Sequence, residues 1–143
     1  EVMRSIRINR ILTDSGIKIL PSAGLKEVRR RLQSCPVGEL FVVRENGELY
    51  GTLTLADLSE WAFDDEFDDV VNAGDVARLR PPFLTLYDNL ETAFSKINET
   101  GEEHLAVVEN KETMLYRGCI HYKDIMSAYN KALVNTRHEE HDE

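Results

Sequence analysis

Two short stretches of the chain place a glycine, a helix-capping position and an aspartate at the same spacing. The first, GTLTLAD, spans residues 51–57, and the second, GCIHYKD, spans residues 118–124. A hydroxyl group and free amides at a helix N-terminus form a natural site for phosphate. An aspartate one turn further on can accept hydrogen bonds from both hydroxyls of a ribose, as acidic residues do in dinucleotide-binding folds. The spacing therefore indicates a nucleotide, with apolar strand edges against its base.

The same residues also fit a purely structural role. Thr54 and Asp57 have nearly the spacing of a capping box, in which Thr54 accepts a hydrogen bond from a first-turn N–H and Asp57 lies near the positive end of the helix dipole. Gly51 would then mark a close backbone approach or a bulge. The second stretch has His121, a weaker cap, yet Asp124 keeps the same distance from its glycine. Spacing alone leaves both interpretations open.

These stretches belong to an internal repeat. Residues 25–43 align with residues 90–108, and each segment has apolar residues at helical spacing followed by a continuous apolar run. The matched helical positions are Leu25, Val28 and Leu32 in one half and Leu90, Ala93 and Ile97 in the other. Each half predicts strand, helix, strand, hairpin, strand and helix, with first strands at 17–20 and 83–87. One half cannot bury both faces of its elements alone, so we expect the two halves to pack sheet against sheet.

The composition narrows the classes of function. The chain has 143 residues, of which 42% are hydrophobic and 30% charged, as in one globular domain or two small units sharing a core. Its formal net charge of −9 disfavours nucleic acid and anionic lipid as partners, although one local pocket can still hold a small anion. No apolar run is long enough to span a bilayer. Because the sequence starts without methionine, we expect a piece of a longer chain.

Neither catalysis nor a metal centre is predicted. No nucleophile, base and orienting residue occur at a recognisable spacing, and no phosphate-loop motif is present. Cys35 and Cys119 lack metal or redox spacing; one disulfide is possible, but we expect buried or idle free thiols in a reducing compartment. The acidic run at 64–69 and the pair His138 and His141 could each contact a metal, but we expect a solvated linker and a solvated tail.

A β-α-β-β-α unit that occurs twice and ends on G-x-x-[T/S]-x-x-D resembles the cystathionine β-synthase (CBS) domain pair, over about residues 2–135. The stretches TLTLADLSEW, GCIHYKDIMSAYNKAL and RHEEHDE are also similar to the cytosolic C-terminal regions of bacterial ClC-type chloride channels and exchangers. The resemblance implies an α/β (α+β) fold of two repeats packed sheet to sheet with pseudo-twofold symmetry. The expected domains are repeat 1 with an N-terminal lead-in at 1–62, an acidic linker at 63–74, repeat 2 at 75–134 and a disordered acidic tail at 135–143.

In this family an adenine nucleotide binds in clefts between the repeats, with its ribose on the motif aspartate. By position, one cleft would take His121, Lys123 and Asp124 together with Glu39, Leu40 and Phe41. The other cleft would take Thr54 and Asp57 together with His104, Leu105 and Ala106. Arg78 and Arg80 flank the second half and offer cations for phosphate.

Four residues depart from the family pattern. His121 stands where a hydroxyl usually contacts phosphate, and Ala56 precedes Asp57 where a basic residue would help. Phe41 and Ala106 stand where the family often has proline. Phe41 could stack on adenine or fill the cleft. These departures put nucleotide occupancy in question, whereas the fold does not depend on them.

The resemblance implies a regulatory binding module and not an enzyme. It implies AMP, ADP or ATP as a ligand, no required cofactor, a homodimer, an upstream transmembrane transporter domain in the same chain, and a place on the cytoplasmic side of the cell membrane. Two alternatives stay open: a ligand-free dimerisation and trafficking scaffold of the same transporter, or a CBS pair that regulates another protein. His121 discriminates between the nucleotide-binding module and the ligand-free scaffold, because a ring that caps the helix or fills the cleft would close the site.

Overall fold

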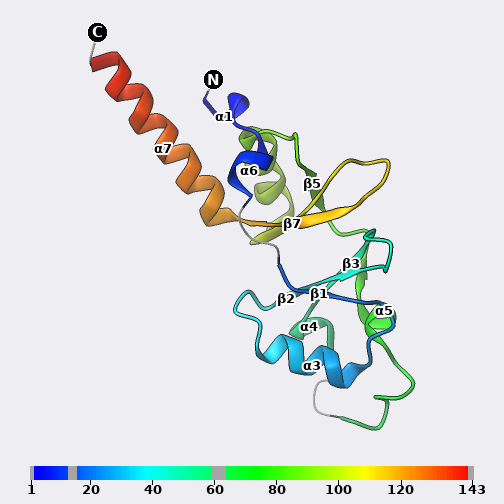
Figure 1. Ribbon diagram of the computed structural model, residues 1–143. Helices are drawn as coiled ribbons and strands as arrows, with labels where there is room; N and C mark the ends of the chain where they lie inside the picture. Colours follow the sequence, from blue (N-terminus) through cyan, green and yellow to red (C-terminus); the bar gives the residue numbers. More distant parts are fainter. Residues whose placement is uncertain (1, 13–15, 59–63, 142–143) are drawn as a thin grey trace. The chain divides into compact units, whose positions relative to one another are not determined.

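The computed structural model describes residues 2–12, 16–58 and 64–141 of the chain, which divides into two compact units (Figure 1). The β1–β4 unit comprises Gly16–Pro81 and Glu112–Tyr116. The β5–β7 unit comprises Glu1–Ser15, Pro82–Lys111 and Arg117–Glu143. Each unit combines a small sheet with helices, so the expected mixture of helices and strands in two halves is confirmed.

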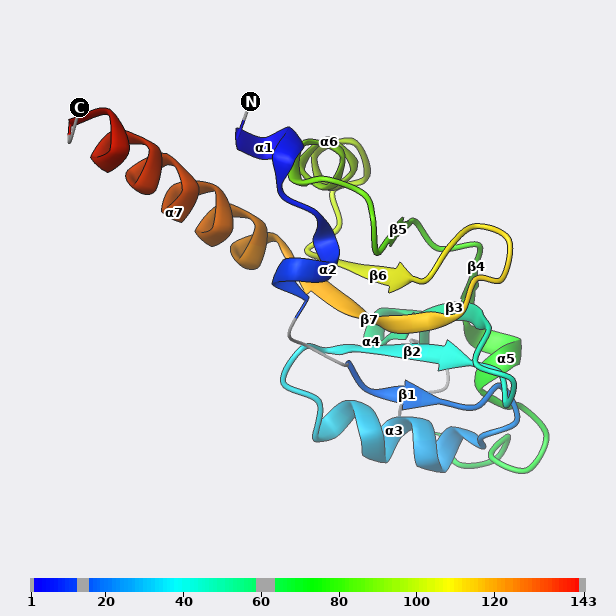
Figure 2. The same ribbon diagram turned by 45° about the horizontal axis from the view of Figure 1, so that its top comes forward.

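The β1–β4 unit has a four-stranded sheet in the order β1-β2-β3-β4. Strand β1 runs parallel to β2, whereas β2–β3 and β3–β4 are antiparallel. Its elements are β1 (Lys18–Ile19), α3 (Leu25–Gln33), β2 (Glu39–Val43), β3 (Leu49–Thr54), α4 (Leu55–Leu58), α5 (Ala73–Val76) and β4 (Arg78–Leu79). Helix α3 lies along one face of this sheet (Figure 2), because its apolar stripe of Leu25, Val28 and Leu32 is buried against the strands.

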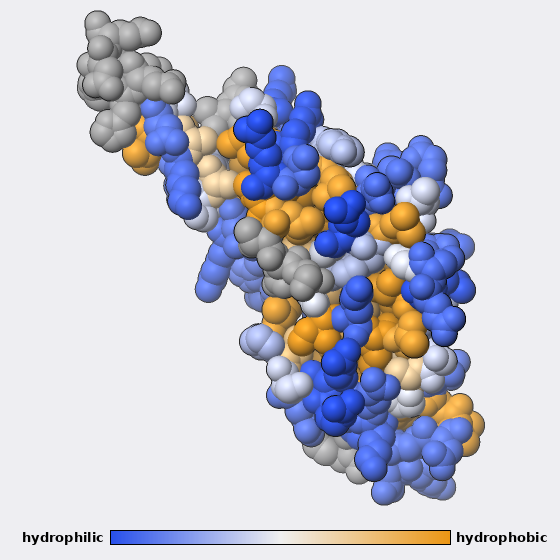
Figure 3. Space-filling model, viewed as in Figure 1, coloured by the Kyte–Doolittle hydropathy of each residue, from blue (hydrophilic) through white to orange (hydrophobic). Residues whose placement is uncertain are grey.

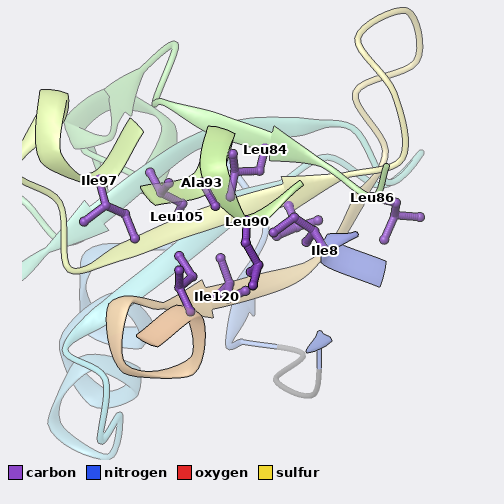
Figure 4. Close-up of a cluster of buried hydrophobic side chains, with 10 residues drawn as sticks. Ile8, Leu84, Leu86, Leu90, Ala93, Ile97, Leu105 and Ile120 are labelled. Atoms are coloured by element: carbon purple, nitrogen blue, oxygen red, sulfur yellow. The ribbon is translucent and has the colours of Figure 1, made fainter. Parts of the chain in front are cut away.

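The β5–β7 unit has a three-stranded sheet in the order β5-β6-β7. Its strands are β5 (Phe83–Thr85), which runs parallel to β6 (His104–Val108), and β7 (Tyr116–His121), and its longer helices are α6 (Leu90–Thr100) and α7 (Tyr122–His141). The stripe Leu90, Ala93 and Ile97 of α6 packs on buried strand residues (Figure 4). The helical stripes predicted from the repeat are therefore the core-facing residues of both units.

The N-terminal lead-in folds with the second half of the chain. It forms α1 (Val2–Ser5) and α2 (Ile8–Ile11), and Ile8 is fully buried in the cluster of the β5–β7 unit (Figure 4). Backbone hydrogen bonds join Ile8 N to Asp88 O and Asn9 N to Leu86 O, both at 2.8 Å. The expected domain at 1–62 joined this lead-in to repeat 1, whereas the lead-in lies in the compact unit of the second half. The apolar segment of the lead-in is too short for its periodicity to assign a packing partner.

The acidic run between the repeats is not uniformly solvated. Arg29 Nη2 lies 2.5 Å from Asp68 Oδ2, and these side chains are only 18% and 16% exposed. The hydrogen bond to Asp68 raises the pKa of Arg29 above its ordinary value. The run therefore anchors the connecting segment to α3, while residues 59–63, where the TLTLADLSEW stretch ends, lie outside the described residues.

The C-terminal segment is helical where disorder is expected. Helix α7 continues to His141, and the ribbon extends well past the sheet of its own unit (Figure 1). Residues 122–141 contain no glycine or proline and include good helix formers such as alanine, leucine, lysine and glutamate, so nothing local ends the helix. Hydrophilic and hydrophobic residues both occur along its described part (Figure 3). Among the described residues no helix is both long and apolar enough to cross a lipid bilayer.

Candidate functional site

The GTLTLAD stretch joins the end of β3 to the start of α4. One carboxylate oxygen of Asp57, Oδ2, accepts hydrogen bonds from the Thr54 backbone N–H at 2.8 Å and from the Thr54 hydroxyl at 3.0 Å. The carboxylate therefore caps the strand-to-helix junction from within the helix. The expected hydrogen bond ran the other way, from a first-turn N–H to the Thr54 hydroxyl. The hydroxyl donates to Asp57 instead because the carboxylate is the stronger acceptor.

A cation lies beside this carboxylate. Arg78 Nε is 3.6 Å from Asp57 Oδ2, and Arg78 Nη2 is 3.6 Å from Glu39 Oε1. Glu39 faces Thr54 across the β2–β3 pair, and β4 brings Arg78 to the same edge. The Glu39 side chain is only 9% exposed, whereas that of Arg78 is 45% exposed and reaches solvent. Glu39, Thr54, Asp57 and Arg78 thus form one polar cluster within the β1–β4 unit, which we call the Asp57 cluster.

Glycine is required at position 51 because the backbone of β4 passes close to it, and not because of its own φ angle. A Cβ atom at this position would lie 2.5 Å from the Arg78 carbonyl oxygen, while the φ angle lies outside the left-handed region. Gly51 pairs with Leu79 of β4, so its missing side chain lets β4 dock and carry Arg78 to Asp57.

Replacing Gly51 with alanine is expected to destabilise the β1–β4 unit by about 1–3 kcal/mol, the usual cost of forcing an extra methyl into a packed site. Urea denaturation followed by circular dichroism measures this change. Gly24→Ala makes the same change in the same unit at the N-cap of α3, where the added Cβ would meet nothing closer than the Asp68 carbonyl oxygen at 3.4 Å, so only the smaller cap preference of glycine is lost. Equal midpoints for the two variants would contradict the close approach of β4.

The second stretch, GCIHYKD, ends β7 and starts α7 with a different arrangement. The His121 backbone N–H donates to Asp124 Oδ2 at 3.2 Å, which matches the bond from Thr54 to Asp57. The Lys123 backbone N–H donates to His121 Nδ1 at 2.9 Å. The imidazole therefore caps α7, and its Nδ1 lone pair is occupied. The Lys123 side chain is exposed, and His121 and Asp124 are half-buried.

The remaining predicted site residues lie at the starts of β2 and β6. Leu40, Phe41, Leu105 and Ala106 are at most 1% exposed. The Phe41 ring packs on Tyr116 of the same unit, with centroids 5.3 Å apart and planes at 30°. This contact uses ring surface that the stacking hypothesis assigned to adenine. His104 begins β6, and its ring centroid lies 4.4 Å from that of His121.

The predicted residues are therefore grouped by unit. Glu39, Leu40, Phe41, Thr54 and Asp57 belong to the β1–β4 unit, and His104, Leu105, Ala106, His121, Lys123 and Asp124 belong to the β5–β7 unit. Sequence reasoning anticipated the glycine, the aspartate and the nearby Arg78, but it missed the pairing of Glu39 with Arg78 and the His104–His121 contact. The repeat contained a signal for the His104–His121 contact, since these residues match Glu39 and Thr54, which pair across β2 and β3.

Solved structures of similar fold cover most of the chain. CBSX2 crystallised in complex with AMP has a TM-score of 0.73 and 21% identity, with 88% of this chain and 97% of that chain covered. A CBS domain pair/ACT domain protein from Thermotoga maritima has a TM-score of 0.74 and 23% identity, with 90% of this chain and 99% of that chain covered. The cytosolic domain of the Mg²⁺ channel MgtE in complex with ATP has a TM-score of 0.67 and 19% identity, with 81% of this chain and 46% of that chain covered. At these identities the likeness concerns the fold.

The family follows from the sequence itself. No curated protein matches the chain. The sequence model of the CBS domain, however, matches it twice, at residues 8–64 and again at residues 73–131. These two matches cover most of the chain and coincide with the two halves of the internal repeat, so this chain belongs to the CBS domain family as a tandem pair.

Proposed function

We propose that this CBS pair is a regulatory module that binds an adenine nucleotide through the Asp57 cluster. The observation that carries the proposal is the ion pair of Asp57 with Arg78, which places a carboxylate suited to ribose hydroxyls beside a partly exposed cation suited to phosphate. CBS pairs of similar fold have been crystallised with AMP and with ATP.

Nucleotide binding would replace existing contacts of Asp57. The ribose hydroxyls would take over the Oδ2 atom that now accepts from the Thr54 hydroxyl, which is then free to contact phosphate. Arg78 would turn from the two carboxylates toward the phosphate. A ligand acts on a module only through its different affinity for two states, and this exchange of partners supplies such a difference.

We further propose that the module is the cytosolic regulatory part of a ClC-type chloride channel or exchanger and acts there as a homodimer on the cytoplasmic side of the membrane. The similarity of the three sequence stretches given above supports this assignment. Relatives of the same fold include the CBS domain of a bacterial CNNM/CorC family Mg²⁺ transporter, at a TM-score of 0.71 and 14% identity, in addition to MgtE. The occurrence of CBS domains of this fold in ion transporters therefore also supports the proposal.

A second candidate function is a ligand-free dimerisation and trafficking scaffold. The imidazole of His121 favours it, because the ring already caps α7 at the position where a phosphate contact is usual. Within the β1–β4 unit, the Phe41 ring is likewise already packed on Tyr116. The two hypotheses differ in whether the Asp57 cluster binds a nucleotide at all.

Isothermal titration of the chain with AMP, ADP and ATP, with and without Mg²⁺, tests the proposal. We expect one of them to bind with a Kd of about 1 mM or lower. Asp57→Asn is expected to weaken that binding by about 10- to 100-fold, since hydrogen bonds to a charged group contribute about 1.5–3 kcal/mol. Asparagine keeps one oxygen to accept from the Thr54 N–H, so the helix start is preserved.

Asp124→Asn is the matched control, because it makes the same change in the other repeat. We expect it to leave the affinity within about twofold of the unmodified chain, while urea denaturation confirms that both variants are folded. Absence of heat for all three nucleotides would contradict the sensor hypothesis and favour the scaffold. Equal losses in both variants would contradict the assignment to the Asp57 cluster.

A further inference from the structure

Three metal-ligating side chains converge at the edge where β6 begins and β7 ends. Glu103, His104 and His121 each offer a ligand atom, and these atoms all lie within 4.8 Å of one another. Strands β6 and β7 are neighbours in the sheet, and the Tyr122 N–H donates to the Glu103 carbonyl oxygen at 3.0 Å. The backbone therefore fixes the strand end that carries His121 beside the strand start that carries the other two residues.

This donor set suits a particular class of ion. Two imidazoles and one carboxylate are the ligands of many zinc sites that leave a fourth position for water, whereas Mg²⁺ and Ca²⁺ prefer oxygen alone. Tetrahedral ligands at zinc distances lie about 3.4 Å apart, so no pair of these ligand atoms has to move closer by more than about 1.4 Å. Glu103 is exposed, so its side chain can rotate to bring the carboxylate toward the two imidazoles.

The ion would have access from solvent. An open hollow of about 530 Å³ adjoins the cluster, and Glu103, His121 and Lys123 are among the residues that line it. The other lining residues are Ile97, Asn98, Gly101, Glu102 and Tyr122, all from the same unit. This hollow leaves room for a water molecule in the fourth position.

Metal coordination and the cap of α7 exclude each other at His121. If the ion takes Nδ1, the lone pair that accepts from the Lys123 N–H is lost. If the ion takes Nε2, the neutral ring carries its proton on Nδ1, which then cannot accept a hydrogen bond. Either mode breaks the Lys123 bond and leaves Asp124 as the cap on the His121 N–H.

We propose that Glu103, His104 and His121 form a binding site for a zinc-class divalent cation, and that ion binding releases the histidine cap at the start of α7. The site lies wholly within the β5–β7 unit and does not require a nucleotide. It goes beyond the proposed regulatory function, because it adds a second ligand and a local change at the long C-terminal helix.

Titration of the untagged, nucleotide-free chain with Zn²⁺ tests the proposal, with Co²⁺ as a spectroscopic probe of coordination. To remove competition from the other two histidines, the titration uses the His138→Ala/His141→Ala variant as its reference. We expect one equivalent of Zn²⁺ to bind and Co²⁺ to show the intense visible absorption of a four-coordinate site. We also expect Zn²⁺, but not Mg²⁺, to shift the backbone amide resonance of Lys123.

In the same background, His104→Ala is expected to weaken Zn²⁺ binding by more than about 100-fold, because loss of a ligand exceeds the 10- to 100-fold effect of losing an indirect contact. Glu103→Gln provides a second variant at an exposed position, for which no effect on folding is expected, and should weaken binding by at least about tenfold. Zn²⁺ affinity unchanged in either variant, or a bound ion that leaves the Lys123 resonance unmoved, would overturn the proposal.

Discussion

Replacing Val108 with aspartate is expected to abolish cooperative folding of the β5–β7 unit. Val108 is fully buried in β6, where it pairs with Thr85 of β5, and its carbonyl accepts from the Leu86 N–H at 3.0 Å. A carboxylate at this position would be removed from water. Burying an unpaired charge is one of the changes that can lower the free energy of unfolding by more than about 4 kcal/mol. The free energy of unfolding of a small domain is only about 5–15 kcal/mol, so this one substitution removes a large part of it.

Val134→Asp is the matched control, since it makes the same substitution in the same unit at a side chain that is 53% exposed. Valine and aspartate have similar helix propensities, so the change within α7 should cost less than about 0.5 kcal/mol. Urea denaturation followed by circular dichroism compares the two variants. A soluble Val108→Asp protein with a cooperative transition near that of Val134→Asp would contradict the strand assignment of β6.

Periodicity explains why the core could be predicted from the sequence. The stripes Leu25, Val28 and Leu32 and Leu90, Ala93 and Ile97 recur at helical spacing, and each precedes a continuous apolar strand. Such patterns report the burial of whole faces, which does not depend on atomic detail. Cys35 and Cys119 are free thiols, as expected, and both are buried.

The candidate site was harder to predict because its contacts join distant segments. Asp57 and Thr54 are three residues apart, yet the direction of their hydrogen bond depends on which group is the better acceptor. Arg78 reaches Asp57 only because β4 docks on Gly51, and His104 reaches His121 only through the pairing of β6 with β7. Local patterns gave the residue types but not these pairings across strands.

Ile8→Ala is expected to lower the free energy of unfolding of the β5–β7 unit by about 2–5 kcal/mol, the usual range for truncating a buried isoleucine. The Ile8 side chain is 0% exposed and lies in the same apolar cluster as Leu84, Leu86 and Leu90 (Figure 4). Deleting its outer carbons removes apolar contacts and leaves a cavity that the surrounding strands and α6 can fill only in part. Urea denaturation of the full chain measures the loss.

Two further variants separate packing from the other contacts of the lead-in. Ile8→Val removes one methyl group and should cost about 0.5–1.5 kcal/mol, giving a graded series at one site. Asn9→Ala changes an exposed neighbour whose backbone N–H still donates to Leu86 O, so we expect less than about 0.5 kcal/mol. If the lead-in merely precedes the first repeat, the Ile8→Ala, Ile8→Val and Asn9→Ala variants would unfold at the same urea concentration. A graded loss confined to Ile8 would instead mean that the segment before the first repeat completes the core of the second, so that movement of the lead-in would act directly on the unit that carries His121 and α7.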